Sequence, residues 1–251
     1  MCRFCALSPG SLSRRKVLRV APAACLLPAG VAADDLVEPA TRLQVPDGAP
    51  RTVALTLDAC SGGTDMRILA TLLELSVPAT LFVTGLWLRA NAEALRWLRA
   101  RPDLFTLQNH GERHLPPVLG ARQVYGLPVA GTIEAVRREV TLGADAIAVA
   151  CGTRPTWYRG ATGRYSPSAL AVIEAMGWRI AGYTLSADAG ASLPAASVAR
   201  RMAAARQGDV ILAHVNHPAR PAGAGVASGV SALRAAGVVF VGLDALPVAT
   251  A

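Results

Sequence analysis

Residues 52–58 read Thr-Val-Ala-Leu-Thr-Leu-Asp, a short run of β-branched and aliphatic residues that ends at a carboxylate. A Ser-Gly-Gly turn follows. Residues 65–75 then carry apolar side chains at the 3.6-residue spacing of a helix, with Thr64 or Asp65 as its N-cap. After a proline, residues 79–84 (Ala-Thr-Leu-Phe-Val-Thr) have the composition of a second buried strand. This stretch predicts a strand–helix–strand unit.

The same alternation continues along the rest of the chain. Further strands are expected at residues 104–107, 156–158, 179–185, 209–213 and 238–241, and further helices at 92–100, 132–149, 166–176, 197–206 and 230–236. Strand runs such as Val-Ile-Leu-Ala and Val-Val-Phe-Val are apolar at every position, as a parallel sheet buried on both faces requires. About seven β–α repeats therefore predict a parallel sheet with helices outside it.

Polar residues stand where the predicted strands end. They are Asp58, His110, Arg159, Asp188 and His214. In a closed barrel these ends converge on one mouth, whereas an open doubly wound sheet would spread them along an edge. The pattern favours a distorted (β/α)7 barrel with parallel strands and outer helices.

The histidines point to a site. Only four occur in 251 residues, and two of them, His110 and His114, stand four apart in Asn-His-Gly-Glu-Arg-His. One turn of helix would aim both imidazoles the same way, which suits a metal site. His214 and His217 follow the apolar run at 209–213. Each histidine alone could also be a capping, core or loop residue.

The net charge of +8 does not indicate a nucleic-acid partner. Residues 1–33 contribute +5 and the rest of the chain +3, which is ordinary for a soluble surface, and few aromatic residues accompany the arginines. The leader contains Ser-Arg-Arg-Lys-Val-Leu at 13–18, an apolar stretch at 20–32 and small residues at 31–33. It resembles a twin-arginine export signal, with a disordered basic leader as the alternative.

The leader predicts a periplasmic or secreted protein. Two prolines and Arg19 interrupt its apolar stretch, so no stable membrane span is expected after cleavage. Cys60 and Cys151 are the cysteines that remain beyond it. In an oxidising compartment they could form a disulfide, and the alternative for Cys151 is a small buried residue.

Five motifs together carry a family resemblance. They are Leu-Thr-Leu-Asp-Ala-Cys (55–60), Asn-His-Gly-Glu-Arg-His (109–114), Tyr-Arg-Gly-Ala-Thr-Gly (158–163), Tyr-Thr-Leu-Ser-Ala-Asp-Ala-Gly (183–190) and Val-Ile-Leu-Ala-His-Val-Asn-His-Pro (210–218). In this order and spacing the chain resembles the polysaccharide deacetylases, carbohydrate esterase family 4, in a divergent branch with Asp-Ala-Cys in the first motif. The resemblance implies a linker at 34–50 and a catalytic domain at 51–247.

The resemblance also implies a chemistry. Such enzymes use one divalent metal, usually Zn²⁺, to remove acetyl groups from amino sugars in a polysaccharide. Here His110 and His114 would bind the metal, Asp58 would act as general base and His214 as general acid. Arg159 matches the arginine that positions the base, and Asp188 matches the carboxylate that orients the acid histidine.

Substrate contacts follow in the same way. Leu212 would line a small apolar pocket for the acetyl methyl group, and Tyr158 and His217 are further candidates for binding the glycan. The Pro- and Gly-rich loop at 115–131 is expected to help select the substrate.

One departure from the family concerns the metal. Family members usually have a second acid after the base, and it binds the metal, but this chain has Ala59. We expect Asp65, beyond the Ser-Gly-Gly turn, to be the third ligand. Cys60 and water are the alternatives. Three functions stay open: an exported metal-dependent N-deacetylase, a metal-free glycan-binding scaffold, and an O-acetyl esterase of the same fold.

Overall fold

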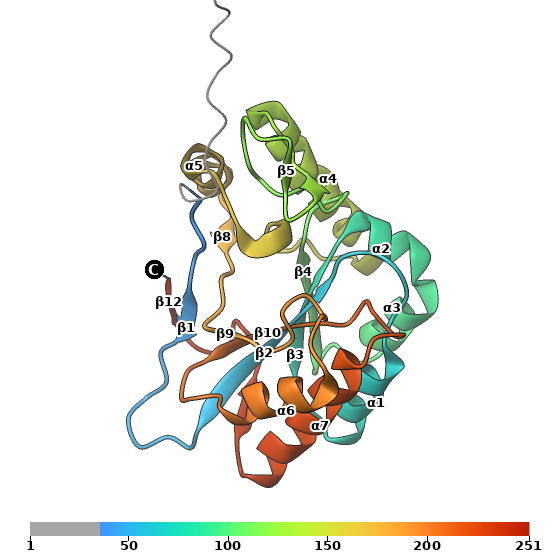
Figure 1. Ribbon diagram of the computed structural model, residues 1–251, viewed down its shortest axis with the longest axis vertical. Helices are drawn as coiled ribbons and strands as arrows, with labels where there is room; N and C mark the ends of the chain where they lie inside the picture. The colour runs from blue at the N-terminus through green and yellow to red at the C-terminus, as the bar shows by residue number, and fades with distance from the viewer. Residues whose placement is uncertain (1–35, 251) are drawn as a thin grey trace, which may run out of the picture.

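The structure is a computed structural model that describes residues 36–250, so the predicted export signal lies outside the described residues (Figure 1). Its strands are β1 (Thr41–Leu43), β2 (Thr52–Ala59), β3 (Ala79–Val83), β4 (Phe105–Asn109), β5 (Gln123–Val124), β6 (Leu127–Pro128), β7 (Trp157–Tyr158), β8 (Arg179–Ile180), β9 (Leu185–Ser186), β10 (Val210–His214), β11 (Val239–Val241) and β12 (Val248–Thr250). Its helices are α1 (Met66–Glu74), α2 (Gly85–Ala90), α3 (Ala92–Arg99), α4 (Ile133–Cys151), the 3-10 turn η2 (Ala161–Gly163), α5 (Pro167–Ala175), α6 (Ala195–Ala203) and α7 (Ala222–Ala235).

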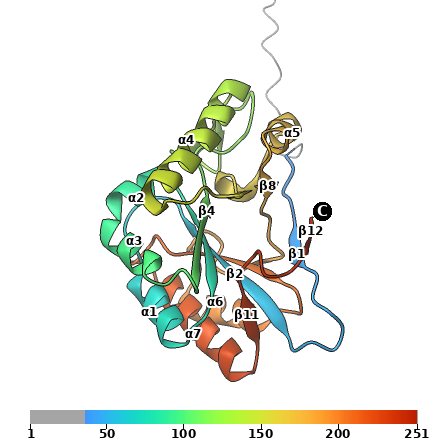
Figure 2. The ribbon, with the colours of Figure 1, turned by 180° about the vertical axis from the view of Figure 1, so that it is seen from behind.

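A curled parallel sheet forms the centre of the molecule. Its strand order is β8-β7-β4-β3-β2-β10-β9, with β11 pairing to the first part of β2, and every pair in it is parallel. The helices lie outside this sheet, with α1, α6 and α7 packed together and α4 beside α5 (Figures 1 and 2). The sheet forms a half-barrel, which confirms the predicted distorted (β/α)7 fold.

Strand β2 shows how the sheet separates two environments. Every residue in it is buried, as expected for a strand covered on both faces. Because side chains alternate along a strand, Leu55, Leu57 and Ala59 pack in the cluster between sheet and helices. Thr56 and Asp58 face the other way, into the half-barrel, where Thr56 contacts Arg159. This alternation decides which residues can reach the site.

Several predicted helix boundaries are confirmed by their caps. The Asp65 side chain accepts a hydrogen bond from the Arg67 amide at the start of α1, and Thr132 caps α4 in the same manner. Gly177 follows α5 with a φ of 85°, the left-handed conformation common just beyond a helix.

Helix α7 begins at Ala222, well before the predicted start at residue 230. Its first half is rich in Gly and Ala, residues without the apolar periodicity that marks a helix in sequence. Their small size instead permits close contact with α6: a Cβ on Gly225 would lie 2.4 Å from the Ala195 carbonyl oxygen. Helix α2, capped by Thr84, was also not predicted.

The predicted strand 179–185 is divided into β8 and β9. Between them, the carbonyl oxygens of Ala181 and Gly182 accept hydrogen bonds from the Arg159 guanidinium, at 3.1 and 2.9 Å. The Gly182 amide donates to the Thr41 hydroxyl. These two carbonyls therefore serve a side chain of the site, whereas the Ala181 amide still donates to the Tyr158 carbonyl of β7.

The segments beyond the barrel also contribute structure. Strand β1 lies within the predicted linker 34–50 and pairs antiparallel with β12. The predicted loop 115–131 contains the short β5–β6 hairpin. Across residues 36–250, the helices are all too short or too polar to cross a bilayer.

Candidate active site

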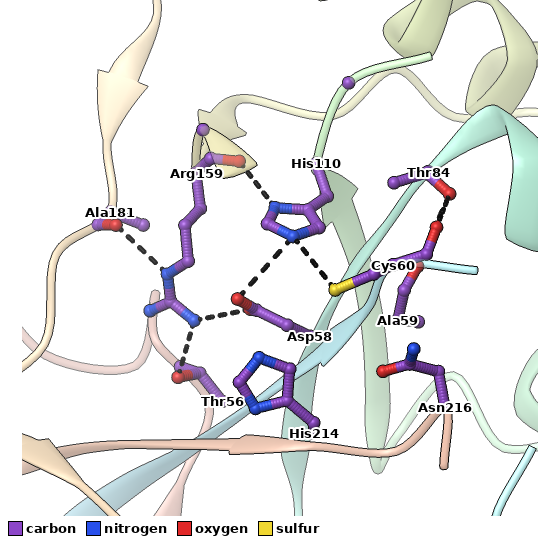
Figure 3. Close-up of polar contacts among 12 residues, drawn as sticks. Thr56, Asp58, Ala59, Cys60, Thr84, His110, Arg159, Ala181, His214 and Asn216 are labelled. Atoms are coloured by element: carbon purple, nitrogen blue, oxygen red, sulfur yellow. Dashed lines mark hydrogen bonds and ion pairs between the residues drawn. The ribbon is translucent and has the colours of Figure 1, made fainter. Parts of the chain in front are cut away.

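The carboxyl ends of four strands bring the predicted site residues together. Asp58 is the penultimate residue of β2 and His214 the last of β10, and the two are paired in the sheet register. His110 follows β4, and Arg159 follows β7. All four line one pocket, and Figure 3 shows their side chains converging within it. Parallel strands end at the same edge, which is why distant sequence motifs meet here.

Asp58 and Arg159 form a buried ion pair. One guanidinium nitrogen of Arg159 lies 2.9 Å from Asp58 Oδ1 and also donates to Thr56 Oγ1. The guanidinium is 1% exposed and stacks over the Phe82 ring at 4.2 Å. Burial raises the pKa of Asp58, but the nearby charges of His110, Arg159 and His214 outweigh it, so the pKa is lowered and the carboxylate is ionised at neutral pH.

His110, His114 and Cys60 form the cluster of potential metal ligands. One ligand atom from each residue lies within 4.8 Å of those of the other two. Cys60 Sγ is 3.6 Å from His110 Nε2, and the two imidazole centroids are 4.9 Å apart. The His110 Nδ1–H donates to the Arg159 carbonyl oxygen at 2.7 Å. Because a carbonyl oxygen only accepts, this bond leaves Nε2 facing Cys60.

The histidines do not lie on a helical turn, so that part of the sequence prediction is wrong. Residues 110–114 form a loop in which Gly111 and His114 have φ values of 88° and 62°. The loop is held from α4 by Glu139, whose carboxylate accepts the amides of Arg113 and Leu115 at 2.8 and 3.1 Å. A Cβ on Gly111 would lie 2.4 Å from that carboxylate. Tertiary contacts, not helical periodicity, bring the two imidazoles together.

Glu139 is thus a positioning residue that the sequence did not reveal. Replacing Glu139 by Ala is expected to leave two loop amides without a partner and to lower the free energy of unfolding by about 1–3 kcal/mol. Zinc affinity is expected to fall as well, since the loop carries both histidines. Urea unfolding and zinc titration of the same variant measure the two effects. Arg138→Ala, an exposed change on the same helix, is the control, and unchanged zinc affinity in Glu139→Ala would contradict the positioning role.

His214 is held by Asp188. The Asp188 carboxylate accepts both the backbone amide and Nδ1–H of His214, at 2.6 and 2.9 Å, and is fully buried. Burial lowers the pKa of His214, but the hydrogen bond and charge of Asp188, with a contribution from Cys60, raise it well above its ordinary value. His214 lines the pocket, so its other ring nitrogen, Nε2, is the one that a substrate there could meet.

Asp65 does not join the histidines, which corrects the expected ligand set. Its carboxylate caps α1 and binds the Arg67 side chain at 2.6 and 2.9 Å. The same Arg67 guanidinium donates to backbone carbonyls of the 218–220 loop, so the pair fastens α1 to that loop. The Ser-Gly-Gly turn therefore carries Asp65 away from the pocket.

Cys60, and not Asp65, lies beside the two histidines. It lies two residues after Asp58 and so faces the same side of the sheet, a signal that strand alternation could have given. Burial raises the pKa of its thiol, but hydrogen bonds with His110, His114 and His214 lower it well below the ordinary value. Cys60 and Cys151 are both free, and Cys151 lies at the end of α4. No disulfide joins them.

The predicted substrate contacts divide into two groups. Leu212 and His217 line the pocket. Tyr158 does not, and this prediction is corrected: the residue is fully buried and packs against Tyr165 and Trp178 under α4 and α5. Alternation along β7 turns Tyr158 outward and Trp157 inward. The pocket is instead lined by Tyr125, on the β5–β6 hairpin, and by Tyr183.

Comparison with known proteins supplies independent information. Residues 46–181 match the family model for polysaccharide deacetylase. No curated protein shows a significant sequence match. Among solved structures, a T48 deacetylase with substrate is 24% identical with a TM-score of 0.62, and the alignment covers 80% of this chain and 92% of that one.

Two further structures show how widely this fold is used. The peptidoglycan deacetylase PdaC from Bacillus subtilis is 21% identical with a TM-score of 0.62, covering 79% of this chain and 90% of that one. A family 4 pseudoenzyme from Bacillus anthracis is 18% identical with a TM-score of 0.61, covering 78% and 65%. Because enzymes and a pseudoenzyme share the fold, activity must be argued from the residues of the site.

Proposed function

The chain belongs to the polysaccharide deacetylase family, and we propose that it is an exported, metal-dependent hydrolase that removes acetyl groups from N-acetylated amino sugars of a cell-wall or chitin-like polysaccharide. One observation carries the proposal. Asp58 and His214 face a common pocket from neighbouring strands, beside the paired imidazoles of His110 and His114. An amide hydrolase needs a base, an acid and an electrophile within reach of one carbonyl, and this pocket offers residues for each role.

His110 and His114 are the residues that would hold a divalent ion, with Zn²⁺ as the expected metal. Their nitrogens and the neighbouring sulfur suit a borderline-soft cation, and the Arg159 carbonyl orients His110 as protein groups commonly orient metal-binding histidines. When bound, the ion would polarise the acetyl carbonyl and lower the pKa of a water to about 7.

Asp58 is the general base in this proposal. Its carboxylate removes a proton from the attacking water as the water oxygen bonds to the acetyl carbonyl carbon. Arg159 holds Oδ1 at 2.9 Å, which leaves Oδ2 directed toward His110 at 3.6 Å. The arginine therefore fixes the direction of the base and keeps it ionised.

His214 is the general acid. Asp188 accepts a hydrogen bond from Nδ1–H, so the imidazolium proton on Nε2 can pass to the sugar nitrogen as the C–N bond breaks. The products are acetate and a free amine. Leu212, 7% exposed on the same strand, supplies an apolar contact for the acetyl methyl group.

The proposal is tested by measuring metal content and acetate release on one purified sample. The protein as isolated is expected to contain about one zinc per chain and to release acetate from N-acetylglucosamine oligomers. Removing the metal with a chelator is expected to abolish release, and added Zn²⁺ to restore it. A chain that neither takes up zinc, cobalt or nickel nor releases acetate would support a glycan-binding scaffold. Faster release from O-acetyl than N-acetyl sugars would support an esterase.

The export part of the proposal rests on the leader sequence. The paired Arg14 and Arg15 precede an apolar stretch and a small-residue cleavage site. A cell-wall or chitin-like polysaccharide is found outside the cytoplasm, so export would bring the enzyme to such a substrate.

A further inference from the structure

We propose that Cys60 is the third metal ligand, so that the metal site is a thiolate–bis-imidazole site in place of the carboxylate site usual in this family. The inference rests on the proposed function, since it assumes that His110 and His114 bind a cation. It goes further by assigning the ligand that the missing acid at Ala59 would otherwise provide, and with it the metal preference of the site.

The first argument is the direction of the side chains. Ala59, directly after the base, is fully buried in the cluster between sheet and helices, so its position faces away from the pocket. Cys60 faces the pocket with Asp58 because side chains alternate along the strand. Figure 3 shows the Cys60 sulfur and the Asp58 carboxylate approaching His110 from β2 and the residue after it. The proposed ligand therefore stands one residue later in the chain than the acid usual in the family. The pocket keeps three donor groups, from Cys60, His110 and His114.

The second argument is distance. With Zn–S of about 2.3 Å and Zn–N of about 2.0–2.1 Å, a tetrahedral site places sulfur and nitrogen about 3.5 Å apart. Cys60 Sγ and His110 Nε2 are 3.6 Å apart. The corresponding atom of His114 lies within 4.8 Å of both. These separations need only small side-chain rotations to reach the ligand-to-ligand distances of a tetrahedral ion.

The third argument is chemical. His110 donates Nδ1–H to the Arg159 carbonyl, so Nε2 is the ring nitrogen that faces the Cys60 sulfur and Asp58 Oδ2. An imidazole nitrogen and a sulfur that face each other beside a second imidazole form a donor set that suits Zn²⁺. Asp58 already gives Oδ1 to Arg159, whereas the described structure gives the Cys60 sulfur no partner other than histidine.

The fourth argument is rigidity. The Thr84 hydroxyl, which caps α2, donates to the Cys60 carbonyl oxygen. The Asn216 side-chain amide donates to the Ser61 carbonyl at 2.7 Å, and the Asn91 amide to the Gly62 carbonyl at 2.8 Å. The backbone around Cys60 is thus fixed by three side chains, two at the ends of α2 and one after β10, as a preorganised ligand requires.

A thiolate ligand changes which metals the site prefers. Sulfur is a soft donor that favours zinc and cobalt over magnesium, calcium or manganese. We therefore expect the protein to bind zinc and cobalt tightly. Magnesium and manganese at the same concentrations should not measurably stabilise the folded protein.

Cobalt spectroscopy of the full chain tests the assignment without relying on turnover. The Co²⁺ form of the unmodified protein is expected to show a thiolate-to-cobalt charge-transfer band in the near ultraviolet. Cys60→Ser should abolish the band and weaken zinc binding by at least about 10–100-fold, since even outer groups of a metal site contribute that much. Cys151→Ser is the matched control and should keep the band. The other cysteines, Cys2, Cys5 and Cys25, stay the same in every variant.

A second measurement covers the case in which Cys60→Ser does not fold. In the unmodified chain, added Zn²⁺ should slow alkylation of Cys60 and leave that of Cys151 unchanged, as peptide mapping would show. A cobalt complex without a charge-transfer band, or equal alkylation of Cys60 with and without zinc, would overturn the inference. If the protein releases acetate but its cobalt form shows no charge-transfer band, Cys60 is not a ligand and the proposed function stands. If the band is present but no acetyl sugar yields acetate, Cys60 is a ligand and the proposed function is wrong.

Discussion

Replacing Asp58 by Asn is expected to reduce acetate release by about 10²–10⁴-fold, the range that general acid–base catalysis contributes. Asparagine keeps the shape of the side chain and an oxygen that can accept from Arg159, but its amide cannot take a proton from water. Bound zinc per chain is expected to stay unchanged, because the Asp58 carboxylate is assigned to the base and not to the ligands. Acetate release and metal content, measured on the same preparation, check both statements.

This experiment needs a stability control. Arg159 is 1% exposed, so removing its counter-charge is expected to lower the melting temperature, although the guanidinium keeps Thr56 and two backbone carbonyls as acceptors. Assays are therefore run well below the melting temperature of the variant. Asp103→Asn, which removes an exposed carboxylate paired with Arg101, should retain full activity. Full activity in Asp58→Asn would exclude it as the base, and loss of zinc would place it among the ligands.

His214→Gln is expected to lower acetate release by a similar factor, about 10²–10⁴-fold, because glutamine cannot deliver a proton to the departing amine. The companion variant Asp188→Asn tests the origin of that proton. Asp188 favours the imidazolium form of His214 and raises its pKa. Removing the negative charge favours the neutral form, so the alkaline limb of the kcat–pH profile should move to lower pH.

The shape of the profile separates a chemical role from a structural one. A variant that only disturbs packing would lower kcat at every pH and leave the alkaline limb in place. Asp145→Asn, a change in a surface ion pair with Arg154, should alter neither kcat nor the limb. An Asp188→Asn profile with the parent's alkaline limb would contradict the role of His214 as the acid.

The site also shows how a family site can persist after losing a ligand. Ala59 removes the usual metal-binding acid, and a pseudoenzyme shares the fold at 18% identity. Yet the residues proposed as base, base-positioning arginine, metal-binding histidines and acid pair still contact one another. Asp188 is fully buried and still holds His214, which lines the pocket.

Much of the fold could be predicted from sequence because its signals are local. Apolar periodicity indicated the repeated strands and helices, and the caps at Asp65 and Thr132 fixed two helix starts. The convergence of Asp58, His110, Arg159 and His214 also followed, since parallel strands end at a common edge. Residues placed at strand ends in sequence needed no further information to be placed together.

The tertiary structure alone decided how the side chains meet. Long-range contacts, absent from local patterns, determine these outcomes: Glu139 of α4 shapes the histidine loop, and carbonyls of the 218–220 loop hold the Arg67 guanidinium that binds Asp65. The sequence by itself determined that a parallel β/α fold would place Asp58, His214 and the pair of histidines at 110 and 114 at one rim, because these residues stand at or beside strand ends. Which donor stands beside those histidines depended on the course of the backbone after β2, because a turn of three residues can direct the following carboxylate toward the pocket or away from it.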